Sequence, residues 1–439
     1  MEKHSKIINL IKAIIIVSVA VTIVIGLSRI LLLKSEDGIS QLQSLYKQPE
    51  NTIDVIFAGS SKVYCDIATG VLWDNYGIAA YDLGGAEAPS WVSYYHLKEA
   101  FKTQKPKVIC YEVSVAAMYD MLYQKNTWAP DNNYGMKWNS NRIDQLRVNS
   151  EEDEFWLRLN PFNIMHGRYN DLNRNDFENI RNSVNYKGFD PREKVDDMDR
   201  PEISQVTGRT PCTEKEEEYI KKIIELVKSE GITPVLFASP CDVSEKEQEI
   251  INYVRDIAES EGVDFLDFNT MVDEFGMNYE TDMADPGHLN YSGNYKFTKY
   301  FGSILKDKYN IPDHRGDGRY ISWDWDAALQ NYERNDLNII NSEDAMDALY
   351  KINENYIVFM INGGAGSIVQ NNEVIAAQDG QFRMTYEADG DVFLFTKKLV
   401  KGKDCYSLYI NDKEYCEEYA NVVIIYDTVR HEYVRAINF

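Results

Sequence analysis

Apolar runs that look like β-strands alternate with amphipathic helical patterns from Ile53 to Leu305, and this alternation constrains the fold more than any other feature. Because parallel strands need crossover connections, which are usually helices, the order predicts an α/β domain with a parallel sheet flanked by helices. The predicted strands are Ile53–Ala58, Gly77–Leu83, Lys107–Val113, Ile232–Ala238 and Val263–Phe268.

A chain of 439 residues is longer than a single domain with one hydrophobic core usually is, so we expect two domains and additional segments. We predict an anchor with a cytoplasmic stub at 1–35, an α/β domain at 36–310, a linker at 311–340 and a β-rich accessory domain at 341–439. An insertion at about 119–213 interrupts the alternation and shows only short helical patches. Long insertions of this kind serve as lids or binding loops, although a purely structural subdomain is an equal alternative.

The N-terminal segment has the composition of a membrane span. Ala13–Ser28 carries no charge, and Ile30–Leu33 extends the apolar run. About 20 apolar residues cross a bilayer core. Three lysines precede the run and two acidic residues follow it, which predicts a single-pass protein with a cytoplasmic N-terminus and an extracytoplasmic catalytic domain. Gly26-Leu27-Ser28 also fits a signal-peptide cleavage site, but the apolar tail after it favours an uncleaved anchor.

The overall charge argues against some partners. The net charge is −24, which disfavours nucleic acid or an anionic bilayer surface as a partner of the soluble part; a solvated acidic surface is the simplest reading. The lipid bilayer is therefore expected as a partner only through the N-terminal helix.

Cysteine and histidine usage indicates neither a disulfide-built fold nor a metal site. Six cysteines are too few for the first, and Cys65 and Cys110 fall in predicted core segments. Cys405 and Cys416 flank a predicted hairpin with Asn411-Asp412 at its turn, and whether they pair is left open. The six histidines show no metal-ligand spacing, so no metal or other cofactor is expected.

Two distant runs predict one active site. Gly59–Ser61 follows the first strand, and Asp285–His288 comes late in the same domain. In a strand-to-helix turn the third position begins the helix, so Ser61 rather than Ser60 is the candidate nucleophile. His288 is the candidate base and Asp285 the group that orients it, as in a Ser-His-Asp triad. The alternative is an ordinary turn with a surface histidine.

These blocks resemble those of the SGNH/GDSL hydrolase superfamily. Gly59–Ser61 resembles the Gly-Asp-Ser block with Ser60 in place of Asp, and Asp285–His288 matches the last block. Tyr81–Gly85 resembles the second block, which implies that Gly84 donates its N–H to the oxyanion. The third block, Gly-x-Asn-Asp, is missing; Glu112-Val113-Ser114 stands there, and Ser114 is the candidate replacement donor.

The missing block, the anchor and the outward orientation resemble the branch of DltD-like and alginate O-acetylation proteins. The resemblance implies a flavodoxin-like strand order and a serine O-acyltransferase or esterase, with acetyl as the expected acyl group. It further implies a cell-envelope or exported polysaccharide as substrate and a membrane-bound O-acyltransferase as a possible partner. A carbohydrate O-deacetylase and a non-catalytic glycan-binding scaffold with a decayed site are the alternatives. At the C-terminus, Leu408–Asn411 through Asn421–Asp427 is similar to the interleukin-like EMT inducer domain.

Overall fold

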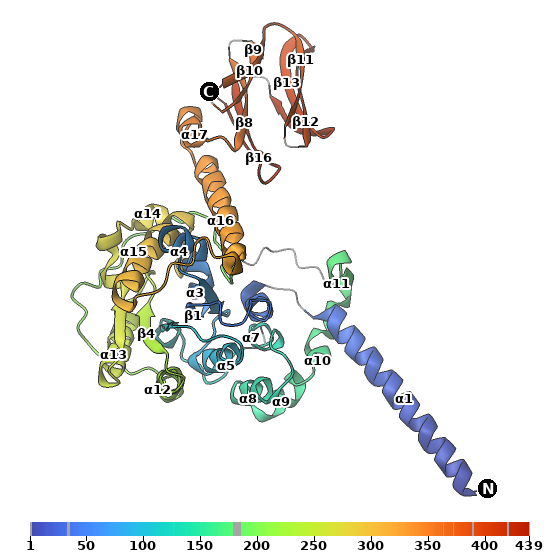
Figure 1. Ribbon diagram of the computed structural model, residues 1–439, viewed down its shortest axis with the longest axis vertical. Coiled ribbons are helices and arrows are strands. Elements are labelled where there is room, and N and C mark those ends of the chain that lie inside the picture. The colour runs from blue at the N-terminus through green and yellow to red at the C-terminus, as the bar shows by residue number, and fades with distance from the viewer. Residues whose placement is uncertain are drawn as a thin grey trace. The chain divides into compact units, whose positions relative to one another are not determined.

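The computed structural model describes residues 2–32, 36–125, 127–178, 186–362, 364–371, 373–388, 390–418 and 421–438. The chain divides into two compact units, Met1–Ala327 and Ala328–Phe439 (Figure 1). The first unit contains the N-terminal helix and the α/β domain, and the second contains the β-rich domain.

A five-stranded parallel sheet forms the centre of the first unit. The strands lie in the order β2-β1-β3-β4-β5, which is the flavodoxin-like order. Their bounds are β1 Val55–Gly59, β2 Ala80–Gly84, β3 Val108–Glu112, β4 Thr233–Ala238 and β5 Asp264–Asp267. The predicted α/β fold class is therefore confirmed. All residues of β1, β2 and β3 are buried, as expected for parallel strands covered on both faces.

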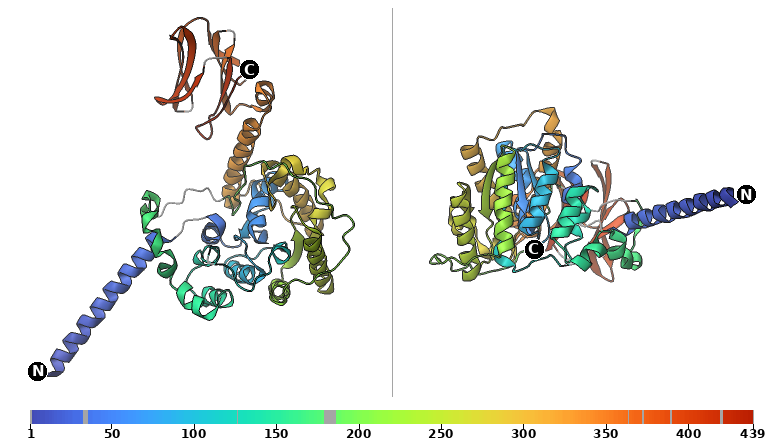
Figure 2. Two further views of the ribbon diagram at one scale, coloured as in Figure 1. Left: turned by 180° about the vertical axis from the view of Figure 1, so that it is seen from behind. Right: turned by 90° about the horizontal axis from the view of Figure 1, so that it is seen from below.

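Helices cover both faces of this sheet (Figure 2). Alternate side chains of β1 point to opposite faces: Ile56 and Ala58 join one core cluster, and Val55 and Phe57 join the other. The first face is covered by α5 Ser90–Ala100, α12 Glu214–Ser229 and α13 Glu245–Ser260. The second is covered by α3 Ser61–Asp66, α4 Thr69–Tyr76 and α15 Tyr291–Tyr309.

Short helices make up the first part of the insertion after β3. They are α6 Val115–Met118, α7 Asp131–Tyr134, α8 Ser140–Val148, α9 Glu152–Arg158, α10 Pro161–Met165, η2 His166–Asn170 and α11 Arg174–Glu178. Buried polar groups hold several of them together. Arg158, only 1% exposed, donates to the carbonyl oxygens of Asn149 (2.6 Å) and Gln124 (3.0 Å). Trp91 Nε1 donates to Asn149 Oδ1 at 2.8 Å, which ties this network to α5.

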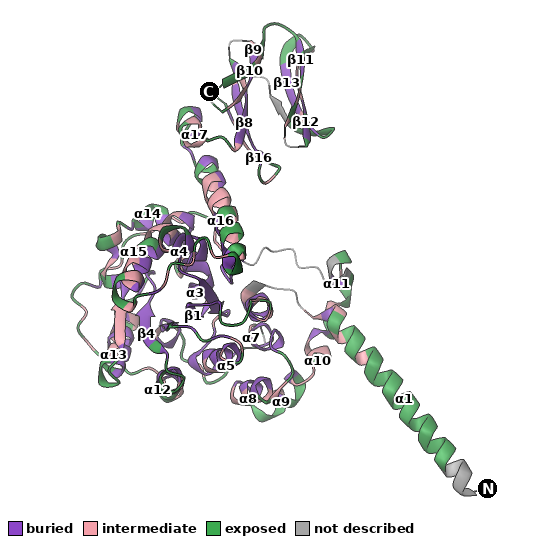
Figure 3. Cartoon of the chain, viewed as in Figure 1, coloured by how far each residue is buried: buried purple, intermediate pink, exposed green. Residues whose placement is uncertain are grey.

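The N-terminal helix α1 runs from Glu2 to Leu31. Within it, Ile7–Leu31 is long and apolar enough to cross a membrane, and no residue of its most apolar stretch is buried (Figure 3). A signal sequence would have the same length and composition.

The second unit is a two-sheet sandwich. Helix α16 (Ile321–Ile340) leads into it and lies largely within the predicted linker. One antiparallel sheet has the order β10-β9-β8-β15-β16 and the other β11-β12-β13-β14. Their bounds are β8 Tyr356–Asn362, β9 Ala365–Gln370, β10 Glu373–Gln378, β11 Phe382–Ala388, β12 Asp391–Val400, β13 Lys403–Ile410, β14 Lys413–Glu418, β15 Val422–Asp427 and β16 Glu432–Asn438. Inward side chains of both sheets share one core, and α17 (Ala345–Lys351) packs on the outer face of the first sheet.

The hairpin predicted at Asn411-Asp412 is confirmed. Both residues have positive φ (49° and 65°), as a two-residue hairpin turn requires, and they join β13 to β14. The backbone of Cys416 lies opposite Leu408. The side chain of Cys416 is outside the described residues, so the question of its pairing with Cys405 falls there too.

Candidate active site

The candidate nucleophile sits where β1 turns into α3. Gly59 ends the strand with φ of +151°, Ser60 is the N-cap of α3, and Ser61 is the first helical residue. A Cβ on Gly59 would lie 2.8 Å from Glu112 Cβ and 3.1 Å from the Glu112 carbonyl oxygen. Glycine therefore allows β1 and β3 to approach closely just before the serine.

The structure brings the three predicted triad residues together. Ser61 Oγ lies 2.8 Å from His288 Nε2, and His288 Nδ1 lies 2.9 and 3.0 Å from the two carboxylate oxygens of Asp285. The last two residues come from a small hairpin of β6 (Met283–Asp285) and β7 (His288–Leu289). In this arrangement Nδ1 donates to the carboxylate and Nε2 accepts from the serine hydroxyl. The His288 side chain is 21% exposed, so the reacting atoms can be reached from solvent.

Neighbouring groups stabilise the ionised form of Asp285. Burial acts to raise its pKa, but the hydrogen bond and charge of His288 outweigh that effect. The Gly287 N–H, which donates to Asp285 Oδ1 at 2.8 Å, and the charge of Lys62 act in the same direction. Together they lower the pKa of Asp285 to about 2. The carboxylate is therefore ionised at neutral pH and can orient the imidazole.

Helix α3 also holds the loop that carries the histidine. Lys62 Nζ donates to the Gly287 carbonyl oxygen at 2.5 Å, and the Leu289 N–H donates to Asp66 Oδ1 at 2.9 Å. Burial acts to lower the pKa of Lys62, but Cys241 and the nearby carboxylates outweigh burial and raise it. The lysine is thus a buried ammonium group. One short helix supplies the nucleophile and fixes the backbone on both sides of the histidine.

Gly84 lies against the turn of the nucleophile. It ends β2 directly opposite Gly59. A Cβ at this position would lie 2.6 Å from the Ser60 carbonyl oxygen and 3.0 Å from Tyr64 Cδ1. Only glycine leaves the turn undisturbed.

Ser114 does not join the triad. It is 1% exposed, and among the described residues its hydroxyl has no hydrogen-bond partner. Its N–H donates to Glu112 Oε1 at 3.0 Å, so that amide already has a partner. No hydrogen bond links it to Ser61 or His288 in the described part of the chain.

Glu112 is the residue that sequence reasoning missed. This fully buried carboxylate ends β3; its Oε2 accepts from Ser60 Oγ at 3.3 Å, and its Oε1 also accepts from the Ser239 N–H at 3.4 Å. With the Ser114 contact, it connects the turns that follow β1, β3 and β4. A charged residue at the end of an apolar strand was the signal available in the sequence.

No group of three or more potential metal ligands occurs among the described residues.

No protein family and no curated protein matches the chain. Among solved structures it is similar to a proposed acylhydrolase from Bacteroides fragilis, with 10% identity and a TM-score of 0.32, over 61% of this chain and 94% of that one. It is also similar to a gut microbial diltiazem-metabolizing enzyme, with 12% identity and a TM-score of 0.24, over 89% of this chain and 73% of that one. Likeness at this level says nothing of activity.

Proposed function

We propose that the protein is a membrane-anchored, extracytoplasmic serine esterase or O-acyltransferase. The observation that carries the proposal is the continuous hydrogen-bond chain from Ser61 through His288 to Asp285. A hydroxyl, an imidazole and an ionised carboxylate in this order are the parts that acyl transfer requires.

In the proposed mechanism, Ser61 Oγ attacks the carbonyl carbon of an acyl ester while His288 Nε2 takes the hydroxyl proton. Asp285 stabilises the resulting imidazolium, and the Gly84 N–H is proposed to donate to the oxyanion. As the ester C–O bond breaks, His288 returns the proton to the departing alcohol and the acyl group stays on the serine. Water or a sugar hydroxyl then gives its proton to His288 and attacks the acyl carbon. The serine oxygen leaves with that proton.

The acyl group is proposed to be acetyl, and the substrate a cell-envelope or exported polysaccharide. The resemblance to the DltD-like and alginate O-acetylation branch supports this choice, as does a candidate membrane helix at the N-terminus. A membrane-bound O-acyltransferase is the proposed partner. With water as the acceptor, the same site would act as a carbohydrate O-deacetylase.

A non-catalytic glycan-binding scaffold is the second candidate. It is favoured by Ser114, whose N–H is occupied by Glu112 and whose hydroxyl is buried. The usual third oxyanion donor is therefore absent from that position.

Acetyl release from an activated ester and acetyl transfer to an oligosaccharide, measured together, test the proposal. Ser61→Ala is expected to lower both rates by roughly a thousandfold or more, because triads lose most of their activity with the nucleophile. Ser60→Ala is the matched control, since the Ser60 hydroxyl bonds Glu112 and not His288. Equal rates in all three proteins would refute catalysis and leave the scaffold. Release without transfer would identify an esterase.

A further inference from the structure

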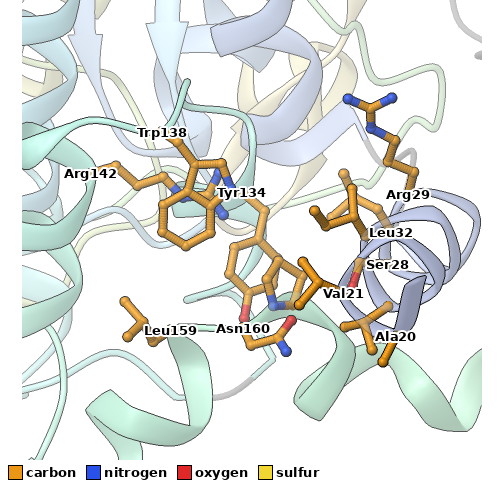
Figure 4. Close-up of a pocket in the computed structure, with 13 residues that line it drawn as sticks. Ala20, Val21, Ser28, Arg29, Leu32, Tyr134, Trp138, Arg142, Leu159 and Asn160 are labelled. Atoms are coloured by element: carbon orange, nitrogen blue, oxygen red, sulfur yellow. The ribbon is translucent and has the colours of Figure 1, made fainter. Parts of the chain in front are cut away.

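A large apolar groove lies between α1 and the insertion, within the first unit (Figure 4). Its volume is about 810 Å³, which is within the usual range of ligand pockets. One wall is a single face of α1 that includes Val24 and Ser28, and Leu32, the residue after the helix, continues the same four-residue spacing. The opposite wall includes Trp138 and Leu159 of the insertion.

The outer end of α1 is fixed to the insertion. Arg168 Nη1 donates to the carbonyl oxygens of Leu31 (2.6 Å) and Leu32 (3.1 Å) at the end of the helix. Asp176 holds the same guanidinium through a 3.1 Å contact. Leu31 is 5% exposed and packs in a small hydrophobic cluster with Met165. The two walls of the groove are therefore joined at the end of the groove nearest Leu31 and Leu32.

The groove follows the half of α1 nearer the α/β domain. Its lining on this side begins at Ala20 of α1 and ends at Leu32, one residue after the helix. At a rise of 1.5 Å per residue this stretch is about 18 Å long, roughly half the 30 Å thickness of a bilayer core. If α1 spans a membrane, the groove opens into the outer leaflet.

Arg142 places a positive charge on this apolar groove. It lines the groove, yet it is only 4% exposed. Its Nε donates to Asn133 Oδ1 at 3.1 Å and its Nη1 to the Met136 carbonyl oxygen at 2.8 Å, whereas Nη2 has no hydrogen-bond partner among the described residues. The guanidinium stacks 4.2 Å from the centre of the Trp138 ring. Burial lowers the pKa of Arg142 to about 10, which leaves it charged at neutral pH.

Exposed aromatic side chains occur on several helices of the insertion. Trp156 on α9, Tyr169 on η2 and Phe177 on α11 are each more than 60% exposed. Tryptophan and tyrosine concentrate where proteins meet the headgroup layer of a membrane. Because η2 and α11 contact α1, Tyr169 and Phe177 add exposed aromatic side chains beside that helix.

We propose that this groove binds one phospholipid of the outer leaflet, with an acyl chain along α1 and the phosphate at Arg142. The inference rests on the proposed membrane anchoring. Continuity with the apolar surface of α1 favours a membrane lipid as the occupant, and a phosphate would supply the acceptor that Arg142 Nη2 lacks. An apolar helix of another protein would leave that donor unpaired in an apolar site.

Native mass spectrometry of the full chain in detergent, titrated with phosphatidylglycerol or with diacylglycerol, tests the proposal. Val24→Trp fills the groove, while Val19→Trp places the same side chain on a part of α1 outside the groove lining, where Val19 is 53% exposed. The wild type and Val19→Trp should each retain one phosphatidylglycerol. Both proteins should bind diacylglycerol with an affinity roughly tenfold or more below that for phosphatidylglycerol. Val24→Trp should lose about tenfold or more in phosphatidylglycerol retention. Arg142→Gln should remove the preference for the phosphate-bearing lipid.

Equal retention by the two tryptophan variants would overturn the groove as a lipid site. Cross-linking of a Val24→Cys variant to a second copy or to another membrane protein, with no lipid retained, would overturn it as well. Wild-type chain that fails to sediment with membranes would refute the anchoring and the inference together. Hydrolysis of a soluble ester by Val24→Trp at the wild-type rate is the control for folding. A wild type that hydrolyses no ester but still retains the lipid would count against the proposed catalysis alone.

Discussion

Replacing Glu112 tests whether the buried carboxylate at the end of β3 organises the active site. In Glu112→Ala, the Ser114 and Ser239 amides and the Ser60 hydroxyl all lose the acceptor to which they donate. An orphaned buried polar group costs about 1–3 kcal/mol. Because two of the contacts are long, at 3.3 and 3.4 Å, values near the lower end apply to them. The expected loss is roughly 3–6 kcal/mol in the free energy of unfolding.

Glu112→Gln should cost far less. The amide oxygen can still accept from Ser114 and Ser239, and the amide nitrogen can donate to Ser60 Oγ. What is lost is the negative charge beside the Lys62 ammonium, which is worth about 1–2 kcal/mol. Because the turn before the nucleophile is retained, esterase activity should stay within about tenfold of the wild type.

Thermal unfolding followed by fluorescence measures both variants. A loss of 3–6 kcal/mol should lower the Tm of the catalytic unit by roughly 10 °C. Glu259→Ala, at an exposed position on α13, is the matched control and should leave the Tm unchanged. If Glu112→Ala melts at the same temperature as Glu259→Ala, the carboxylate does not connect the three turns, and the reasoning fails.

Three further predictions address the other supports of the site and the topology. Gly84→Ala should lower activity about a hundredfold by displacing the turn at Ser60. Gly287→Ala, whose Cβ would have no neighbour nearer than 3.4 Å, should be tolerated. Equal activities of the two variants would contradict the role of Gly84 in positioning that turn. Folding lowers the pKa of Asp285 from 3.8 to about 2, so its ionised form stabilises the protein above about pH 4, and that stability is lost as the pH falls toward 2. Asp285→Asn should therefore show a shallower fall in Tm between pH 4 and 2, and a slope like that of the wild type would count against the contact with His288. A reporter fused to the C-terminus should be active only outside the cytoplasm, and cytoplasmic activity would reverse the proposed topology.

The sheet could be predicted because four of its five strands are almost fully buried and thus appear as largely apolar runs. The predicted strand Ile53–Ala58 became β1, Val55–Gly59, and Ile232–Ala238 became β4, Thr233–Ala238. The ends of the five predicted strands shifted by up to three residues, since hydrophobicity does not mark where ladder pairing stops. The meeting of Ser61 with His288 followed from the same order, because loops after parallel strands gather at one edge of a sheet.

Parts of the molecule whose packing depends on polar contacts could not be predicted. Arg158 and Asn149 are almost fully buried in the insertion, yet their sequence context suggests solvent. Ser114 was predicted as an oxyanion donor from its position in a family block. In the structure, Glu112 rather than Ser114 contacts the turn that carries the nucleophile, because it accepts a hydrogen bond from Ser60 Oγ. Strand β10 (Glu373–Gln378) of the second unit is mostly exposed on both faces, so its sequence lacks the apolar signal of a core strand.

The double attachment of the histidine loop to α3 has a consequence for motion. Since Lys62 and Asp66 of one short helix bond the backbone on either side of His288, the nucleophile and the base move as a single body. A displacement of about 1 Å between such groups can reduce the rate a hundredfold. Fluctuations of the insertion are thereby decoupled from the Ser61–His288 distance. The surrounding surface can rearrange while the proton-transfer distance stays constant.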